Sequence, residues 1–179
     1  MKRIVWTFGL ISGGMMAAMM AVTIPFENQI GDKGEIIGYT TMILAFLMVY
    51  FGIRSHRDTM MDGAIGFGRA FQVGILITVI ASACYVAAWE VIYHTMAPDF
   101  AEKYAARAIE KARTSGASAA QLEAKRTEMA KFAEMYKNPV LNVGMTFLEV
   151  LPIGVVVVLV SAGILSRKKP VTVADPLRA

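Results

Sequence analysis

Glu149 has the clearest potential for chemistry in this sequence, because it lies deep inside a long apolar segment. An ionised side chain at that depth of a bilayer costs about 3 kcal/mol or more, so such acids are usually functional. Asn142 and Thr146 precede Glu149 by seven and three residues, so a helix places all three side chains on one face. Pro152 follows them, lacks a backbone N–H and leaves the carbonyl of Leu148 without its helical donor.

This polar stripe has two interpretations. An acid beside an interrupted helix is the arrangement with which transporters bind ions near the middle of the bilayer. Alternatively, Glu149 is protonated and hydrogen-bonds to a neighbouring helix, which would hold the bundle together. We favour the second interpretation, because no other acid or base is certain to lie at the same depth.

Glu90 and His94 form a second candidate pair, one helical turn apart near the end of another apolar segment. The two side chains could share a proton, or hold a metal ion together with Asp99. An acid close to the membrane surface can also simply reach water with its carboxylate. We favour that simpler interpretation and predict no metal site.

Arg57 and Asp58 are a third candidate, in a predicted loop that also contains His56. We expect these side chains to be solvated rather than catalytic. The glycines of Gly63–Gly68 lack the spacing and the preceding strand of a phosphate-binding loop. One cysteine, Cys84, allows neither an intrachain disulfide nor a cysteine metal cluster. No catalytic residue and no cofactor is therefore predicted.

The elements that must position these residues are transmembrane helices. Apolar residues make up 56% of the 179 residues and charged residues 18%, a composition typical of integral membrane proteins. Crossing the hydrocarbon core takes about 20 helical residues. Four continuous apolar segments meet this length, at residues 4–24, 36–53, 71–93 and 140–165. The sequence thus predicts an all-α, four-transmembrane-helix bundle, with residues 1–179 forming a single membrane domain. The first segment is longer than the core of a signal peptide, so we expect it to be retained.

The basic residues predict the orientation of this bundle. Nine of them lie at the N-terminus, in the loop 54–70 and in the tail 166–179, against three acids. These three regions are on one side of a four-helix bundle, and the positive side is cytoplasmic. Both termini are therefore expected in the cytoplasm. The net charge of +4 then reflects contact with lipid headgroups and implies no nucleic-acid partner.

The third and fourth segments are joined by a long polar connection, predicted to form an extracytoplasmic helical hairpin over residues 98–137. Ser118 and Gln121 have the spacing of a capping box, which starts the second helix. Asn138-Pro139 ends it. We favour a hairpin that packs on itself or extends the third and fourth segments above the membrane. The alternative is a docking surface for a partner outside the cytoplasm.

A ladder of small residues runs along the first segment, with one residue every four positions. Small side chains let another helix approach the backbone closely. The sequence leaves open whether this helix belongs to the same chain or to a second copy. The ladder consists of Gly9, Gly13, Ala17 and Ala21.

Several short motifs together resemble a family of bacterial four-helix membrane proteins, catalogued as domain of unknown function 4199. The resemblance implies a bacterial inner-membrane location and four spans, and it implies no activity. The motifs are Trp6–Gly13, Gly38-Tyr39, Gly52-Ile53-Arg54, Arg57-Asp58, Gly66–Phe71 with Gly74, Tyr136–Pro139 and Phe147–Gly154.

The function we expect is that of a non-enzymatic accessory or structural protein of the inner membrane. We expect the protein to lie in the lipid bilayer. Its expected partner is a second copy of the chain, or another membrane protein that binds the hairpin. The alternative is a small proton- or ion-coupled transporter that uses Glu149, with Arg57, Asp58 or Glu90 in the access routes.

Overall fold

A computed structural model describes residues 1–31 and 33–166, and almost all of them are helical. No strand occurs in this part of the chain, which confirms the all-α fold class. The predicted tail 166–179 lies outside the described residues apart from Ser166. In chain order the elements are α1 (Lys2–Thr23), a 3-10 turn η1 (Ile24–Phe26), α2 (Glu27–Ile30), α3 (Lys33–Met60), α4 (Phe67–Thr95), α5 (Phe100–Thr114), α6 (Ala119–Lys137) and α7 (Pro139–Leu165).

Four of these helices are long and apolar enough to cross a membrane, namely α1, α3, α4 and α7. Each buries one stripe of its surface and leaves large apolar side chains on the outside, such as Leu148 at 67% and Val156 at 59% exposure. Apolar surface of this extent is not stable in water, so it is the surface that contacts lipid. The chain is a multi-pass membrane protein.

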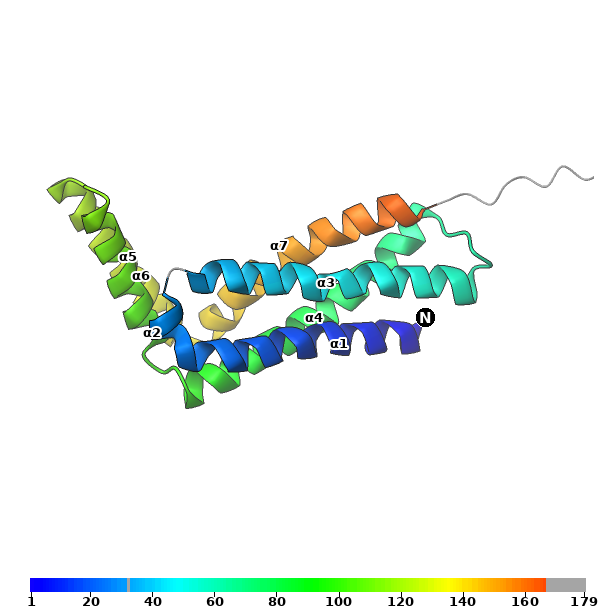
Figure 1. The fold of residues 1–179 in the computed structure, drawn as a ribbon, viewed down its shortest axis with the longest axis horizontal. Coiled ribbons are helices and arrows are strands. Elements are labelled where there is room, and N and C mark those ends of the chain that lie inside the picture. Colours follow the sequence, from blue (N-terminus) through cyan, green and yellow to red (C-terminus); the bar gives the residue numbers. More distant parts are fainter. Residues whose placement is uncertain (32, 167–179) are drawn as a thin grey trace, which may run out of the picture.

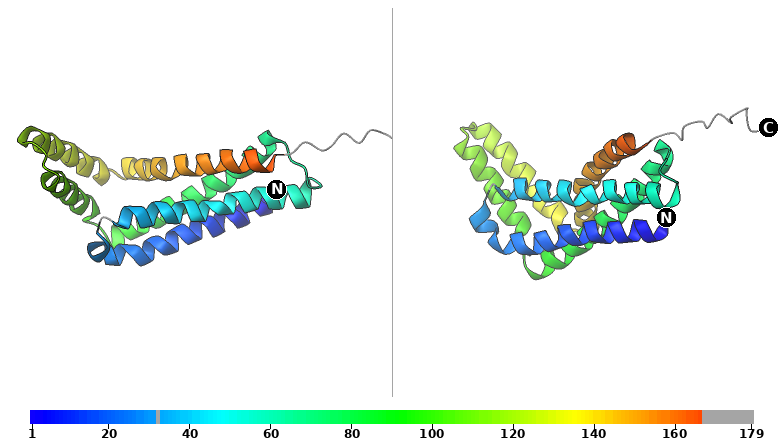
Figure 2. Two further views of the ribbon diagram at one scale, coloured as in Figure 1. Left: turned by 45° about the horizontal axis from the view of Figure 1, so that its top comes forward. Right: turned by 45° about the vertical axis from the view of Figure 1, so that its right-hand side comes forward.

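The four spans form one bundle in which α1 packs on α3 and α4, and α7 packs on α3 and α4. Figure 1 shows the N-terminus, the α3–α4 connection and the end of α7 together at one end, which we call the loop end. The helices α5 and α6 pack on one another beyond the opposite end, which we call the hairpin end (Figure 2). Ser118 and Gln121 form the expected capping box at the start of α6.

The packing of α1 on α4 depends on two glycines of the small-residue ladder. A Cβ atom on Gly9 would lie 2.8 Å from Ile80, and one on Gly13 would overlap Cys84. Ala17 is half-buried and Ala21 is exposed. The first two positions of the ladder therefore face a helix of the same chain, and only the last two are accessible to another molecule.

The structure differs from the predicted loop over residues 54–70. Helix α3 continues to Met60 and α4 already begins at Phe67, so the connection is shorter than predicted. Asp62 and Gly63 both have positive φ, 49° and 79°, and they turn the chain between the two helices.

Candidate functional site

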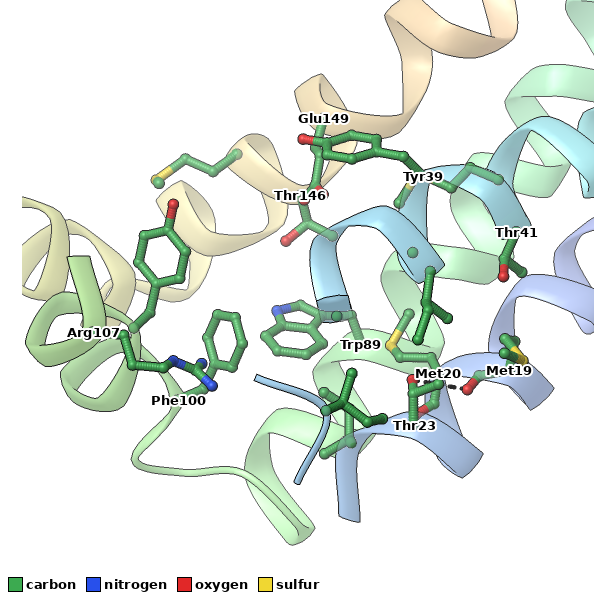
Figure 3. Close-up of a pocket in the computed structure, with 18 of the residues that line it drawn as sticks. Met19, Met20, Thr23, Tyr39, Thr41, Trp89, Phe100, Arg107, Thr146 and Glu149 are labelled. Atoms are coloured by element: carbon green, nitrogen blue, oxygen red, sulfur yellow. Dashed lines mark hydrogen bonds between the residues drawn. The ribbon is translucent and has the colours of Figure 1, made fainter. Parts of the chain in front are cut away.

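A cavity of about 620 Å³ lies at the hairpin end, between the bundle and the helices α5 and α6 (Figure 3). All four spans and both hairpin helices contribute to its lining. Ligand sites commonly have this volume and a largely apolar lining. Many of the lining side chains contain sulfur or an aromatic ring, among them Met16, Met19, Met20, Met145, Tyr39, Tyr85, Trp89, Phe100, Tyr104, Phe132 and Tyr136.

Glu149 lines this cavity and is exposed. Figure 3 shows Glu149 and Thr146 on the same stretch of α7. Among the described residues, no hydrogen bond and no ion pair involves the Glu149 carboxyl group. The favoured interpretation required a hydrogen bond from this group to a neighbouring helix, and the structure does not contain it. Glu149 instead presents to the cavity a carboxyl group without a partner among the described residues.

Asn142 has a different role from Glu149, although the sequence placed both on one helix face. Its side chain is buried, and its Oδ1 accepts hydrogen bonds from Trp89 Nε1 at 3.1 Å and from Thr146 Oγ1 at 3.3 Å. Its Nδ2 donates to the carbonyl oxygen of Tyr136 at 3.5 Å. The amide thus ties α7 to α4 and to the end of α6.

Trp89 also belongs to an aromatic cluster that joins α4 to the hairpin. Its ring centroid lies 4.8 Å from that of Phe100 on α5 in an edge-to-face arrangement. On α6, the ring of Phe132 lies 5.1 Å from Tyr136 and 5.3 Å from Tyr104 of α5. Burial raises the pKa of the Tyr136 phenol to about 12, so this group is neutral at physiological pH.

Trp89 is a residue of this cluster that the sequence analysis did not single out. The structure buries this side chain to 5% exposure. A signal was present in the spacing, since Ser82, Val86 and Trp89 follow one another at four and three residues on the buried face of α4.

Pro152 is exposed and lies within α7, which runs past it as one helix. Glu90 and His94 do not line the cavity. His94 Nδ1 lies 2.8 Å from the backbone oxygen of Glu90 and 3.8 Å from its carboxylate. Asp99 instead pairs with Lys103 at 2.9 Å, which holds the pKa of Asp99 below its usual value. Within residues 1–31 and 33–166, no group of three potential metal ligands occurs.

The third candidate lies at the loop end, far from the cavity along the bundle. Arg57 Nε donates to Asp58 Oδ1 at 2.7 Å, and Arg54 Nε lies 3.6 Å from the other carboxylate oxygen of Asp58. The expectation that His56 is solvated is wrong, because its side chain is only 2% exposed. Neither ring nitrogen of His56 has a hydrogen-bond partner in the described part of the chain.

A family model described as "protein of unknown function (DUF4199)" matches residues 7–167. The chain belongs to the DUF4199 family. No curated protein and no solved structure matches it. The DUF4199 match therefore identifies the family without assigning an activity.

The DUF4199 match includes nearly all of the described structure. It spans the lining of the cavity from Met16 to Glu149 and the buried amide of Asn142. The cavity thus lies within the DUF4199 region and is not formed by an appended segment.

Proposed function

We propose that this chain is a non-enzymatic accessory protein of the bacterial inner membrane that acts through α5 and α6. The observation that carries the proposal is the position of these two helices, which stand beyond the bundle with a charged, exposed surface. Basic residues gather at the loop end, which supports a cytoplasmic location of both termini and an extracytoplasmic hairpin. The exposed charged side chains of α6 include Glu123, Arg126, Glu128, Lys131 and Glu134.

Photo-crosslinking in native membranes tests this proposal. A crosslinking amino acid at Glu123, on the exposed side of α6, is expected to capture one membrane or extracytoplasmic protein reproducibly. The same amino acid at Thr7, at the loop end of α1, is the control and should not capture that protein. The captured protein, labelled in turn, should capture this chain. Recovery of monomer and self-contacts alone would contradict an accessory role.

Ion-coupled transport is the second candidate, and the unpaired carboxyl group of Glu149 in the cavity favours it. An acid that exchanges a proton or an ion needs access to water and freedom from a permanent partner. In proteoliposomes loaded with a pH-sensitive dye, a pH gradient is expected to collapse at least tenfold more slowly with Glu149→Gln. Glu134→Gln is the matched control, since Glu134 is an exposed acid of α6 that lies outside the cavity. Equal rates for wild type and Glu149→Gln would rule out this use of Glu149.

A further inference from the structure

Glu149 differs in its surroundings from three acids that form ion pairs within the chain. Asp58, Asp99 and Glu110 are each paired with a basic side chain of the same chain. Glu149 has no such partner among the described residues, although it lies within a membrane-spanning helix. A carboxylate in apolar surroundings is strongly stabilised by a cation that comes close to it.

The lining around Glu149 also suits a cation that carries apolar groups. Aromatic rings attract cations over their faces, and four of the lining rings belong to Tyr39, Tyr85, Trp89 and Tyr136. The methionines beside them are flexible and polarizable, so they adapt to ligands of different shape. A volume of about 620 Å³ accommodates a drug-sized molecule.

Among the described lining residues, the basic side chains all belong to α5 and α6, namely Arg107, Lys111 and Lys125. Lys125 pairs with Glu128 at 3.0 Å. Arg107 and Lys111 each have an interaction within the chain as well. Among the described residues that line the cavity, the charged side chain without an ion pair or hydrogen bond is therefore Glu149.

We propose that the cavity binds a lipophilic organic cation, with its ammonium or phosphonium centre beside the Glu149 carboxylate and its apolar groups among the aromatic rings. This inference goes beyond an accessory role at the hairpin. It also does not require transport, since a bound cation is enough to balance the negative charge of the carboxylate. A binding measurement and the crosslinking and flux measurements can therefore fail independently of one another.

The two tryptophans make the binding directly measurable. Trp6 is 57% exposed at the loop end and does not line the cavity, whereas Trp89 does. Trp6→Phe leaves Trp89 as the sole tryptophan, because the sequence contains two. The purified protein in a neutral detergent is titrated with tetraphenylphosphonium, and with tetraphenylborate as an anion of the same shape. Empty micelles give the correction for partitioning.

Tetraphenylphosphonium is expected to change the Trp89 fluorescence in a saturable manner. Glu149→Gln should weaken this binding by about tenfold or more, while Glu149→Asp, which keeps the charge, and the control Glu90→Gln should retain most of it. Tetraphenylborate should not compete. Tighter binding of tetraphenylborate than of tetraphenylphosphonium, or equal binding of the cation by Glu149→Gln, would overturn the proposal. Retention of folded, monodisperse protein by Glu149→Gln separates loss of charge from loss of fold.

Discussion

Gly154→Ala is expected to destabilise the bundle by about 1–3 kcal/mol, the usual cost of overpacking a well-packed interior. Gly154 is buried on α7 where this helix crosses α3 and α4. A Cβ atom there would overlap the methyl group of Thr78 and lie 2.9 Å from the ring of Phe46. Thr78 and Phe46 are themselves fully buried, so neither side chain can move away without displacing others.

Gly163→Ala is the matched control, because it makes the same change in the same helix. A Cβ atom on Gly163 would meet nothing within 4 Å. Alanine also favours a helix over glycine by up to about 1 kcal/mol, so this variant should be neutral or slightly more stable. Both variants are heated in detergent and the remaining monodisperse protein is followed by size-exclusion chromatography. Equal midpoints for the two variants would contradict the close contact of α7 with α3 and α4.

The four spans could be predicted from the sequence because continuous apolar runs of this length have few other structures. The end of α3 could not be placed, because the run of charges at Arg54, Arg57 and Asp58 resembled the start of a loop. Charged residues do not stop a helix, and α3 continues until Asp62 and Gly63 take up positive φ. The loop predicted at residues 54–70 was therefore too long.

His56 illustrates the consequence of that error. In a loop, its side chain would be solvated. In a continuous helix, it follows Val49 and Ile53 by seven and three residues, and both of these are fully buried. Extending the helical periodicity beyond the apolar run would have placed His56 in the core. Helical periodicity could not predict that its ring nitrogens have no hydrogen-bond partner among the described residues, because this depends on the neighbouring helices.

The candidate site could be predicted only in part, for a similar reason. Helical spacing correctly placed Asn142 and Thr146 together, since this depends on α7 alone. Trp89, which also donates a hydrogen bond to Asn142, lies 53 residues away from it in the sequence. Only the packing of α4 on α7 brings these two side chains together. The exposure of Glu149 likewise follows from the space between the bundle and the hairpin. A local sequence pattern cannot predict this space.

Asn142→Leu is expected to weaken the connection between the bundle and the hairpin. Leucine has the same branching and as many side-chain heavy atoms as asparagine, and it removes the acceptor of both Trp89 Nε1 and Thr146 Oγ1. Leaving a buried donor without an acceptor costs about 1–3 kcal/mol, although hydrogen bonds between membrane helices contribute less, about 0.6 kcal/mol on average. The ring of Trp89 is held against Phe100 and Tyr136, so its N–H keeps its position when the Asn142 acceptor is removed. We therefore expect a loss of about 1–3 kcal/mol of stability.

Thr146→Val separates the contribution of the indole from that of the hydroxyl group. This variant removes one donor but leaves Asn142 Oδ1 bonded to Trp89, so it should cost clearly less than Asn142→Leu. In the Trp6→Phe background, Asn142→Leu should also change the emission of Trp89, since its N–H loses a partner, whereas Thr146→Val should leave the emission nearly unchanged. Equal stability and equal emission of the two variants would show that Asn142 is not the residue that joins α4 to α7 at the hairpin end. The position of the aromatic cluster would then depend on ring packing alone.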